Sequence, residues 1–188
     1  MNSRMTKDEV VEKLGFAERR LRELLTLNDG HFAGADQTER QQLLQEFFFH
    51  LVGATEVLAQ LVNEVQGLNI PYEDVDVSKV ARKLQAEDPI KPTLASLHVN
   101  TRGAQLTSDP YSDEGYIFRI LIYRHHVTHR RRKPFHFRVG STPSASLLLD
   151  PRDPEGPHPG PSEKSVQDEL RYMFDLIEAR CGEIMSSL

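Results

Sequence analysis

One long helical pattern constrains the fold of this chain more than any other feature. From Asp36 to about residue 66, apolar residues recur at steps of three and four, as on the buried face of a helix. Gly67 follows the last turn, where glycine commonly ends a helix, and Gly53 within the pattern indicates close packing against another backbone. A helix of about 30 residues is about 45 Å long, the length of a strut in a helical bundle. The apolar positions are Leu43, Leu44, Phe47, Phe48, Leu51, Val52, Ala54, Val57, Leu58, Leu61, Val62 and Val65.

The same periodicity predicts further helices on either side of this one. Three long helices are expected at residues 6–27, from Ser112 or Asp113 to at most 133, and from about Ser165 to the end. Thr6 and Glu9 form a capping box for the first of them, and Pro134 limits the second. Two short helices are expected within residues 76–88, capped by Ser78 or Asp76, and within residues 93–100, with a break bracketed by Pro89 and Pro92.

The segment before the last helix has a different character. "FHFRVG" alternates and "SASLLLD" is strand-like, so a β-hairpin is expected at about 134–150, followed by a proline-rich loop at about 151–162. The single cysteine, Cys181, lies on the apolar face of the last helix and is expected to be a core residue. The predicted fold is mainly α: one domain over residues 1–188, a bundle of four to five helices with an appended β-hairpin before the C-terminal helix.

Charge is distributed unevenly along the chain. The net charge is −5, yet no acidic residue lies between Glu114 and Asp150. The rest of the chain therefore contains all 28 acidic residues but only 16 of the 23 basic residues. A basic segment on an acidic body favours a polyanionic partner, although cations at the end of a helix can also be a solvated run that suits the helix dipole. The seven basic residues of this window are Arg119, Arg124, Arg130, Arg131, Arg132, Lys133 and Arg138.

Within this window, Arg124 occupies a position at which an apolar residue is expected. It continues an apolar stripe at helical spacing, formed by Ile117, Ile120, Leu121, Val127 and Thr128. A guanidinium that faces inward must be paired or must line a cleft, because burying it alone is costly. It could be a structural residue paired with Glu46 or Glu56 on the long helix, or it could serve a site.

Histidines follow Arg124 directly. His125 and His129 are four residues apart and share a helix face, whereas Arg124 and His129 are about 140° apart around one helix. A second copy of the helix across a two-fold axis would bring Arg124 and His129 into one cleft, and the nearly all-round apolar sequence before Tyr123 favours such a homodimer. Histidine can take a proton from a ribose 2′-OH and give one to a leaving 5′-oxygen, while arginine suits the extra charge of a phosphorane-like transition state. "RRRK", residues 130–133, is placed to hold phosphates beside them.

"RHHVTH", after the apolar "YIFRILIY" on a late helix of an all-α chain, resembles the signature of the HEPN superfamily. The resemblance implies a metal-independent endoribonuclease that needs no cofactor, acts as a homodimer through the motif-bearing helix, and belongs to a toxin–antitoxin or phage-defence system. It implies that Arg124 stabilises the transition state, that His129 is the acid/base, and that His125 takes the polar second position. It also implies RNA as substrate and an antitoxin protein as a candidate partner. From their position beside the motif, Arg130, Arg131, Arg132 and Lys133 are expected to bind that substrate.

The chain also departs from the family, and other interpretations stay open. One subset of the family carries a tyrosine two residues after the histidine as the site of inhibitory modification, and here that position is Arg131. A metal site of His125, His129 and His136 with an outside carboxylate is a rival, disfavoured by the positive surroundings. A non-catalytic nucleic-acid-binding or interaction module is the other rival. No signal peptide or membrane-spanning segment is evident, so a cytoplasmic location without membrane association is expected.

Overall fold

In the computed structural model, the described residues are 5–26, 36–99, 111–128, 138–139, 146–147 and 166–188. Six α-helices, one short 3-10 helix and two short strands lie within these ranges. The mainly helical bundle predicted from the sequence is therefore confirmed. The elements in chain order are α1 (Lys7–Thr26), α2 (Asp36–Val65), η1 (Tyr72–Asp74), α3 (Val77–Lys83), α4 (Lys91–Ser96), α5 (Asp113–Thr128), β1 (Arg138–Val139), β2 (Ser146–Leu147) and α6 (Val166–Ser187).

Local chemistry sets several of these helix ends, as the sequence predicts. The backbone N–H of Thr6 donates to the Glu9 carboxylate at 2.7 Å, which is half of the expected capping box at the start of α1. Gly67 has a φ of 59° after α2, in the left-handed region that favours glycine. At the start of α3, Asp76 is the cap, because its carboxylate accepts from the backbone N–H of Lys79 at 2.7 Å.

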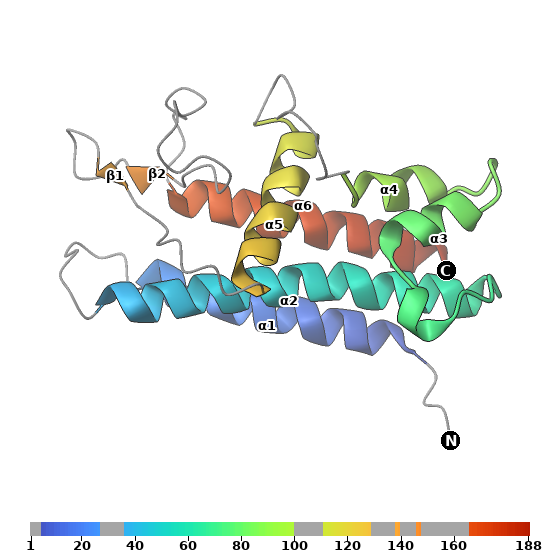
Figure 1. The fold of residues 1–188 in the computed structure, drawn as a ribbon, viewed down its shortest axis with the longest axis horizontal. Helices are drawn as coiled ribbons and strands as arrows, with labels where there is room; N and C mark the ends of the chain where they lie inside the picture. Colours follow the sequence, from blue (N-terminus) through green and yellow to red (C-terminus); the bar gives the residue numbers. More distant parts are fainter. Residues whose placement is uncertain (1–4, 27–35, 100–110, 129–137, 140–145, 148–165) are drawn as a thin grey trace.

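Long helices run side by side and one helix crosses them (Figure 1). α1 and α2 form an antiparallel pair, and α6 lies along the same bundle, so the three share one core. α5 crosses α6 and α2 steeply, whereas the short helices α3 and α4 lie beside the C-terminal ends of α2 and α6. The crossing brings the end of α5 against the middle of α2, which places the candidate site.

The core is apolar and continuous across these helices. Phe47, Phe48 and Leu51 of α2 are fully buried between α1 and the other long helices. Cys181 is buried as expected, and burial, with a smaller contribution from Glu178, raises the pKa of its thiol to about 12. Gly53 does not mark close backbone packing: the atom nearest to a β-carbon built there is a methylene carbon of Lys13, at 3.8 Å.

Two other expectations differ from the structure. Pro92 does not belong to a break but lies in the first turn of α4, where a missing N–H costs no hydrogen bond. β1 and β2 pair antiparallel, with Arg138 opposite Leu147, but each has only two residues. This pairing does not establish the predicted hairpin, since most of residues 134–150 and all of the predicted loop at 151–162 lie outside the described residues.

No helix among the described residues is long and apolar enough to span a membrane.

Candidate functional site

The first turn of α5 is fixed to its neighbours. Ser112 caps the helix, its hydroxyl accepting from the backbone N–H of Gly115 at 3.2 Å. The next residue, Asp113, accepts one hydrogen bond from the Tyr172 hydroxyl at 2.6 Å and one from the Arg180 guanidinium at 2.9 Å. Because Tyr172 and Arg180 both belong to α6, these contacts hold the start of α5 against α6.

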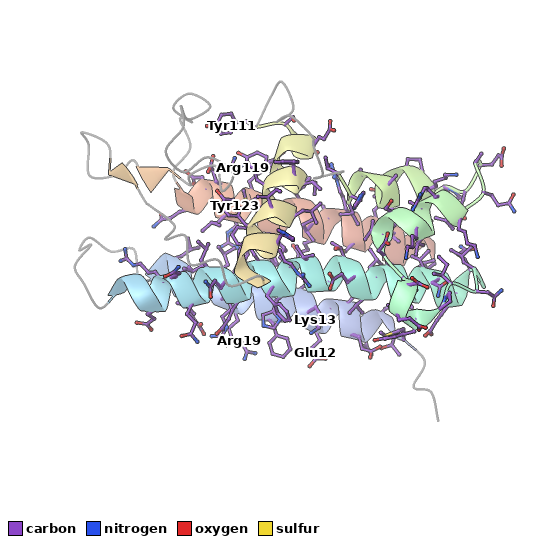
Figure 2. All side chains as sticks on the ribbon, viewed as in Figure 1. Glu12, Lys13, Arg19, Tyr111, Arg119 and Tyr123 are labelled. Atoms are coloured by element: carbon purple, nitrogen blue, oxygen red, sulfur yellow. The ribbon has the colours of Figure 1, made fainter. Side chains whose placement is uncertain are left out.

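The middle of α5 carries a buried ion pair. Arg119 donates to the carboxylate of Glu169 on α6 at 2.9 Å, and their side chains are only 8% and 2% exposed. The guanidinium also lies over the rings of Tyr111 and Tyr116, at 5.8 and 5.2 Å from their centroids. Figure 2 shows Arg119 and Tyr111 beside α5. Burial would lower the pKa of Arg119, but the nearby Tyr123 and Glu169 outweigh it and the pKa is raised, so the guanidinium stays charged.

Tyr116 packs against the ion pair of Arg119 and Glu169 and belongs to the same cluster. It is fully buried, and burial, helped by the carboxylate of Glu169, raises its pKa to about 12. The phenol therefore stays neutral at physiological pH and is not suited to accept a proton. This cluster fixes α5 in the bundle; it lies one to two helical turns before the residues of the motif.

Burial within one chain accounts for the all-round apolar sequence of α5. Tyr116, Ile117, Phe118, Ile120, Ile122 and Tyr123 are all buried. The sequence argument for a homodimer used this pattern, on the expectation that a second helix would cover part of α5. The single chain already covers it, so a homodimer has to be supported by the motif itself.

At the end of its buried part, α5 presents Arg124 at an edge of the bundle. Tyr123 is fully buried and stacks on Phe48 of α2, with ring centroids 4.9 Å apart and planes at 20°. The next residue, Arg124, remains 27% exposed, and its guanidinium lies 3.3 Å from the Glu56 carboxylate on α2. The guanidinium is thus paired, as the structural interpretation expects, but it is not sealed in the core.

The structure distinguishes between the two predicted partners of Arg124. Glu46, the other candidate, pairs with Arg20 of α1 at 2.9 Å. The side chains of Arg124 and Glu56 are 27% and 53% exposed, so both remain accessible to solvent and to a ligand. An anion such as a phosphate could therefore compete with Glu56 for the guanidinium.

Only part of the predicted site can be placed. His125 follows Arg124 on α5 and is exposed. His129 and the predicted phosphate-binding residues Arg130, Arg131, Arg132 and Lys133 lie outside the described residues. The spatial relation of Arg124 to His129, and the roles of all these residues, stay predictions.

The rival metal site has the same status. Among the described residues, no group of three or more histidine, cysteine, aspartate or glutamate side chains is arranged to hold a metal ion. His129 and His136, two of the three predicted ligands, are outside that part of the chain, so the metal site stays untested.

A second titratable group, which the sequence analysis missed, lies where α1 and α2 meet. The ring of His50 contacts Phe16 and Phe49, with centroids 5.2 and 5.5 Å away. Burial lowers the pKa of His50, the positive charge of Lys13 lowers it further, and Glu46 partly opposes both. Figure 2 shows Lys13 on α1 along this face of the bundle. His50 is thus held in its neutral form near pH 7.

Helical spacing would have revealed neither His50 nor Arg119, because their surroundings come from other helices. The signal for Arg119 was its place inside "YIFRILIY", where apolar residues lie on both sides. For His50, a polar residue within the apolar run of α2 was the signal.

Comparisons with known proteins leave these interpretations open. No protein-family model, no curated protein and no solved structure matches the chain significantly.

Proposed function

We propose that this chain is a metal-independent endoribonuclease of the HEPN type. The observation that carries the proposal is the position of Arg124, the first residue of "RHHVTH", at the edge of the bundle. The residue before it is fully buried, while its own side chain is 27% exposed and its guanidinium lies 3.3 Å from the half-exposed carboxylate of Glu56. A guanidinium so held can exchange its carboxylate for a phosphate oxygen, which has a similar bidentate geometry.

The proposed reaction uses the 2′-oxygen of the RNA as the nucleophile. His129, in its neutral form, takes the proton of the 2′-OH while this oxygen attacks the adjacent phosphorus. Arg124 stabilises the negative charge that accumulates on the phosphoryl oxygens. The bond from phosphorus to the 5′-oxygen then breaks, and a protonated histidine supplies the proton to the leaving oxygen. The products are a 2′,3′-cyclic phosphate and a 5′-hydroxyl end.

The remaining predicted residues and partners belong to the same proposal. His125 takes the polar second position, and Arg130, Arg131, Arg132 and Lys133 hold the phosphates on either side. Because helical spacing would place Arg124 and His129 about 140° apart if the helix continued to residue 129, we propose that a homodimer completes the cleft with one residue from each chain. A role in a toxin–antitoxin or phage-defence system, with an antitoxin protein as partner, follows from the resemblance, and we propose a cytoplasmic location.

The pair between Arg124 and Glu56 also favours a second candidate function. If Glu56 keeps Arg124 in a structural role, the domain is a non-catalytic nucleic-acid-binding or interaction module. The nature of the reaction product separates the two. The nuclease proposal expects end-labelled RNA to be cut in the presence of EDTA, with 2′,3′-cyclic phosphate ends identified by mass spectrometry. No cutting, or cutting that EDTA abolishes, contradicts it.

A further inference from the structure

The chain that follows α2 is held firmly against the helix. The side chain of Asn63, on the last turns of α2, donates to the carbonyl of Ile70 and accepts from its backbone N–H, both at 3.0 Å. Lys83 of α3 donates to the carbonyl of Leu68 at 2.8 Å. This segment is therefore a fixed surface and does not depend on a ligand for its shape.

Tyr72 projects from this fixed segment into solvent. Its side chain is 68% exposed, the largest exposure among the described bulky apolar and aromatic residues. Its backbone carbonyl accepts a hydrogen bond from Gln60 of α2 at 3.0 Å. The backbone is thus anchored while the ring stays accessible, as in a platform on which a planar group can stack.

A groove with both cations and carboxylates on its rim lies beside Tyr72. It has a volume of about 430 Å³ and is lined by Ile70, Pro71, Asp74, Lys79, Arg82 and Lys83. Lys79 lies between two carboxylates, 3.0 Å from Asp74 and 3.8 Å from Asp76. Arg82 and Lys83 are further exposed cations on this rim, and Ile70 and Pro71 are its apolar lining.

Tyr72 and Arg124 reach the same face of α2. Gln60, which holds Tyr72, follows Glu56, which holds Arg124, by four residues. Residues four apart on a helix lie on one face, about 6 Å apart along its axis. The end of α5 lies against α2 in Figure 1, whereas η1 follows the C-terminal end of α2 along the chain. An extended strand bound at Arg124 could thus reach Tyr72 within a few nucleotides.

We propose that Tyr72 and the groove bind nucleotides of a single-stranded RNA next to those held at Arg124. This inference rests on the proposed function, which supplies RNA as the ligand. An exposed aromatic ring stacks on any base, and nearby cations track the phosphates, which is the general combination for binding single strands. Tyr72 stacks a base, and Arg82 and Lys83 contact the phosphates that flank it. An acidic protein would use the cations but would not require the aromatic ring.

The test measures binding apart from cleavage. A fluorescein-labelled 12-nucleotide RNA with 2′-O-methyl groups cannot be cut by 2′-oxygen attack, so its fluorescence anisotropy reports binding alone. Tyr72→Leu is expected to weaken binding by about 5- to 150-fold, the range for loss of one stacked base, whereas Tyr72→Phe keeps the ring and stays within about twofold of wild type. The double variant Arg82→Gln, Lys83→Gln is expected to reduce the slope of log affinity against log salt by about 1.4, or about 0.7 for each lost phosphate contact. Arg22→Gln, which removes an exposed cation from α1, is the matched charge control.

Each outcome decides the inference separately from the nuclease proposal. If Tyr72→Leu binds the RNA as tightly as Tyr72→Phe, the inference is wrong, even if the protein cuts RNA. If binding depends on the Tyr72 ring but unmodified RNA is never cut, the inference stands and the nuclease proposal fails. If uridine monophosphate displaces the 12-nucleotide RNA at concentrations near the Kd of that RNA, the groove is a site for a free nucleotide and the inference of an RNA path is wrong. Binding of poly-glutamate in place of RNA would also overturn the inference.

Discussion

Arg124 and Glu56 form a partly exposed ion pair, 3.3 Å apart, at the point where the buried part of α5 ends against α2. Such a pair contributes little to stability, because solvent screens it. Under the proposed function, the Glu56 carboxylate would compete with a phosphate of the RNA for the Arg124 guanidinium.

Replacing this competitor is expected to favour RNA binding. Glu56→Gln removes the negative charge that lies beside the guanidinium of Arg124, so affinity for the uncleavable RNA should rise by about 2- to 10-fold. The free energy of unfolding should change by less than about 1 kcal/mol. Anisotropy and urea unfolding measure the two quantities. Glu46→Gln is the matched control, since Glu46 pairs with Arg20 and not with Arg124. Equal effects of the two substitutions would show that only net charge matters.

The buried pair of Arg119 and Glu169 should behave in the opposite way. Arg119→Met or Glu169→Leu alone leaves an uncompensated charge in the core and is expected to lower the free energy of unfolding by about 3–5 kcal/mol. The double variant removes both charges and should recover most of this loss. Urea unfolding of the four proteins gives the coupling energy. Single variants that each lose less than about 1 kcal/mol would contradict the assignment of the pair as a buried, charged one.

His50 should make stability depend on pH. Its pKa in the folded chain is lowered from 6.5, so the unfolded chain binds more protons between the two pKa values. The contribution of neutral His50 is thus complete above pH 6.5 and is lost as pH falls through 6.5 toward the lowered pKa. Urea unfolding at pH 5.5 and 7.5 should show a smaller pH dependence for His50→Gln than for wild type.

A matched histidine controls for this effect. His98 is exposed, so His98→Gln is the control for the loss of a histidine elsewhere in the chain. If His50→Gln and His98→Gln have the same pH dependence, His50 is not the group that titrates.

A mixing experiment tests the proposed homodimer. If each cleft combines Arg124 of one chain with His129 of the other, a dimer of one Arg124→Ala chain and one His129→Ala chain has one complete cleft and one empty cleft. Co-expression of the two variants with different affinity tags, followed by tandem purification, should yield a protein that cuts RNA although neither variant does so alone. An inactive mixed dimer would mean that both residues act within one chain or that the dimer is not formed through α5.

The sequence predicted the features that depend on neighbouring residues. The capping of α1 by Thr6 and Glu9 and the end of α2 at Gly67 follow from local backbone chemistry. The long helices follow from the three- and four-residue spacing of apolar residues, which does not depend on what the helices pack against. Features that join distant segments were not predictable, because a helical period says which face is buried but not what covers it.

Arg124 and Arg119 illustrate that limit. The period of α5 placed Arg124 on the buried stripe, but it could not decide between Glu46 and Glu56, ten residues apart on α2, since the choice depends on where α5 crosses. The same period gave no reason to pair Arg119 with Glu169, which is 50 residues away on α6. Tyr72 was overlooked because an exposed aromatic in a short 3-10 helix has no periodic signal.

We propose that Arg124 and His129 cut RNA without a metal ion. This is tested by the cleavage rate of a long unstructured RNA in EDTA by wild type, Arg124→Ala and His129→Ala, with binding of the uncleavable RNA measured in parallel. We expect that wild type cuts, that each variant loses about 100-fold or more of the rate, and that His129→Ala still binds RNA. A His129→Ala protein that cuts as fast as wild type would contradict this proposal.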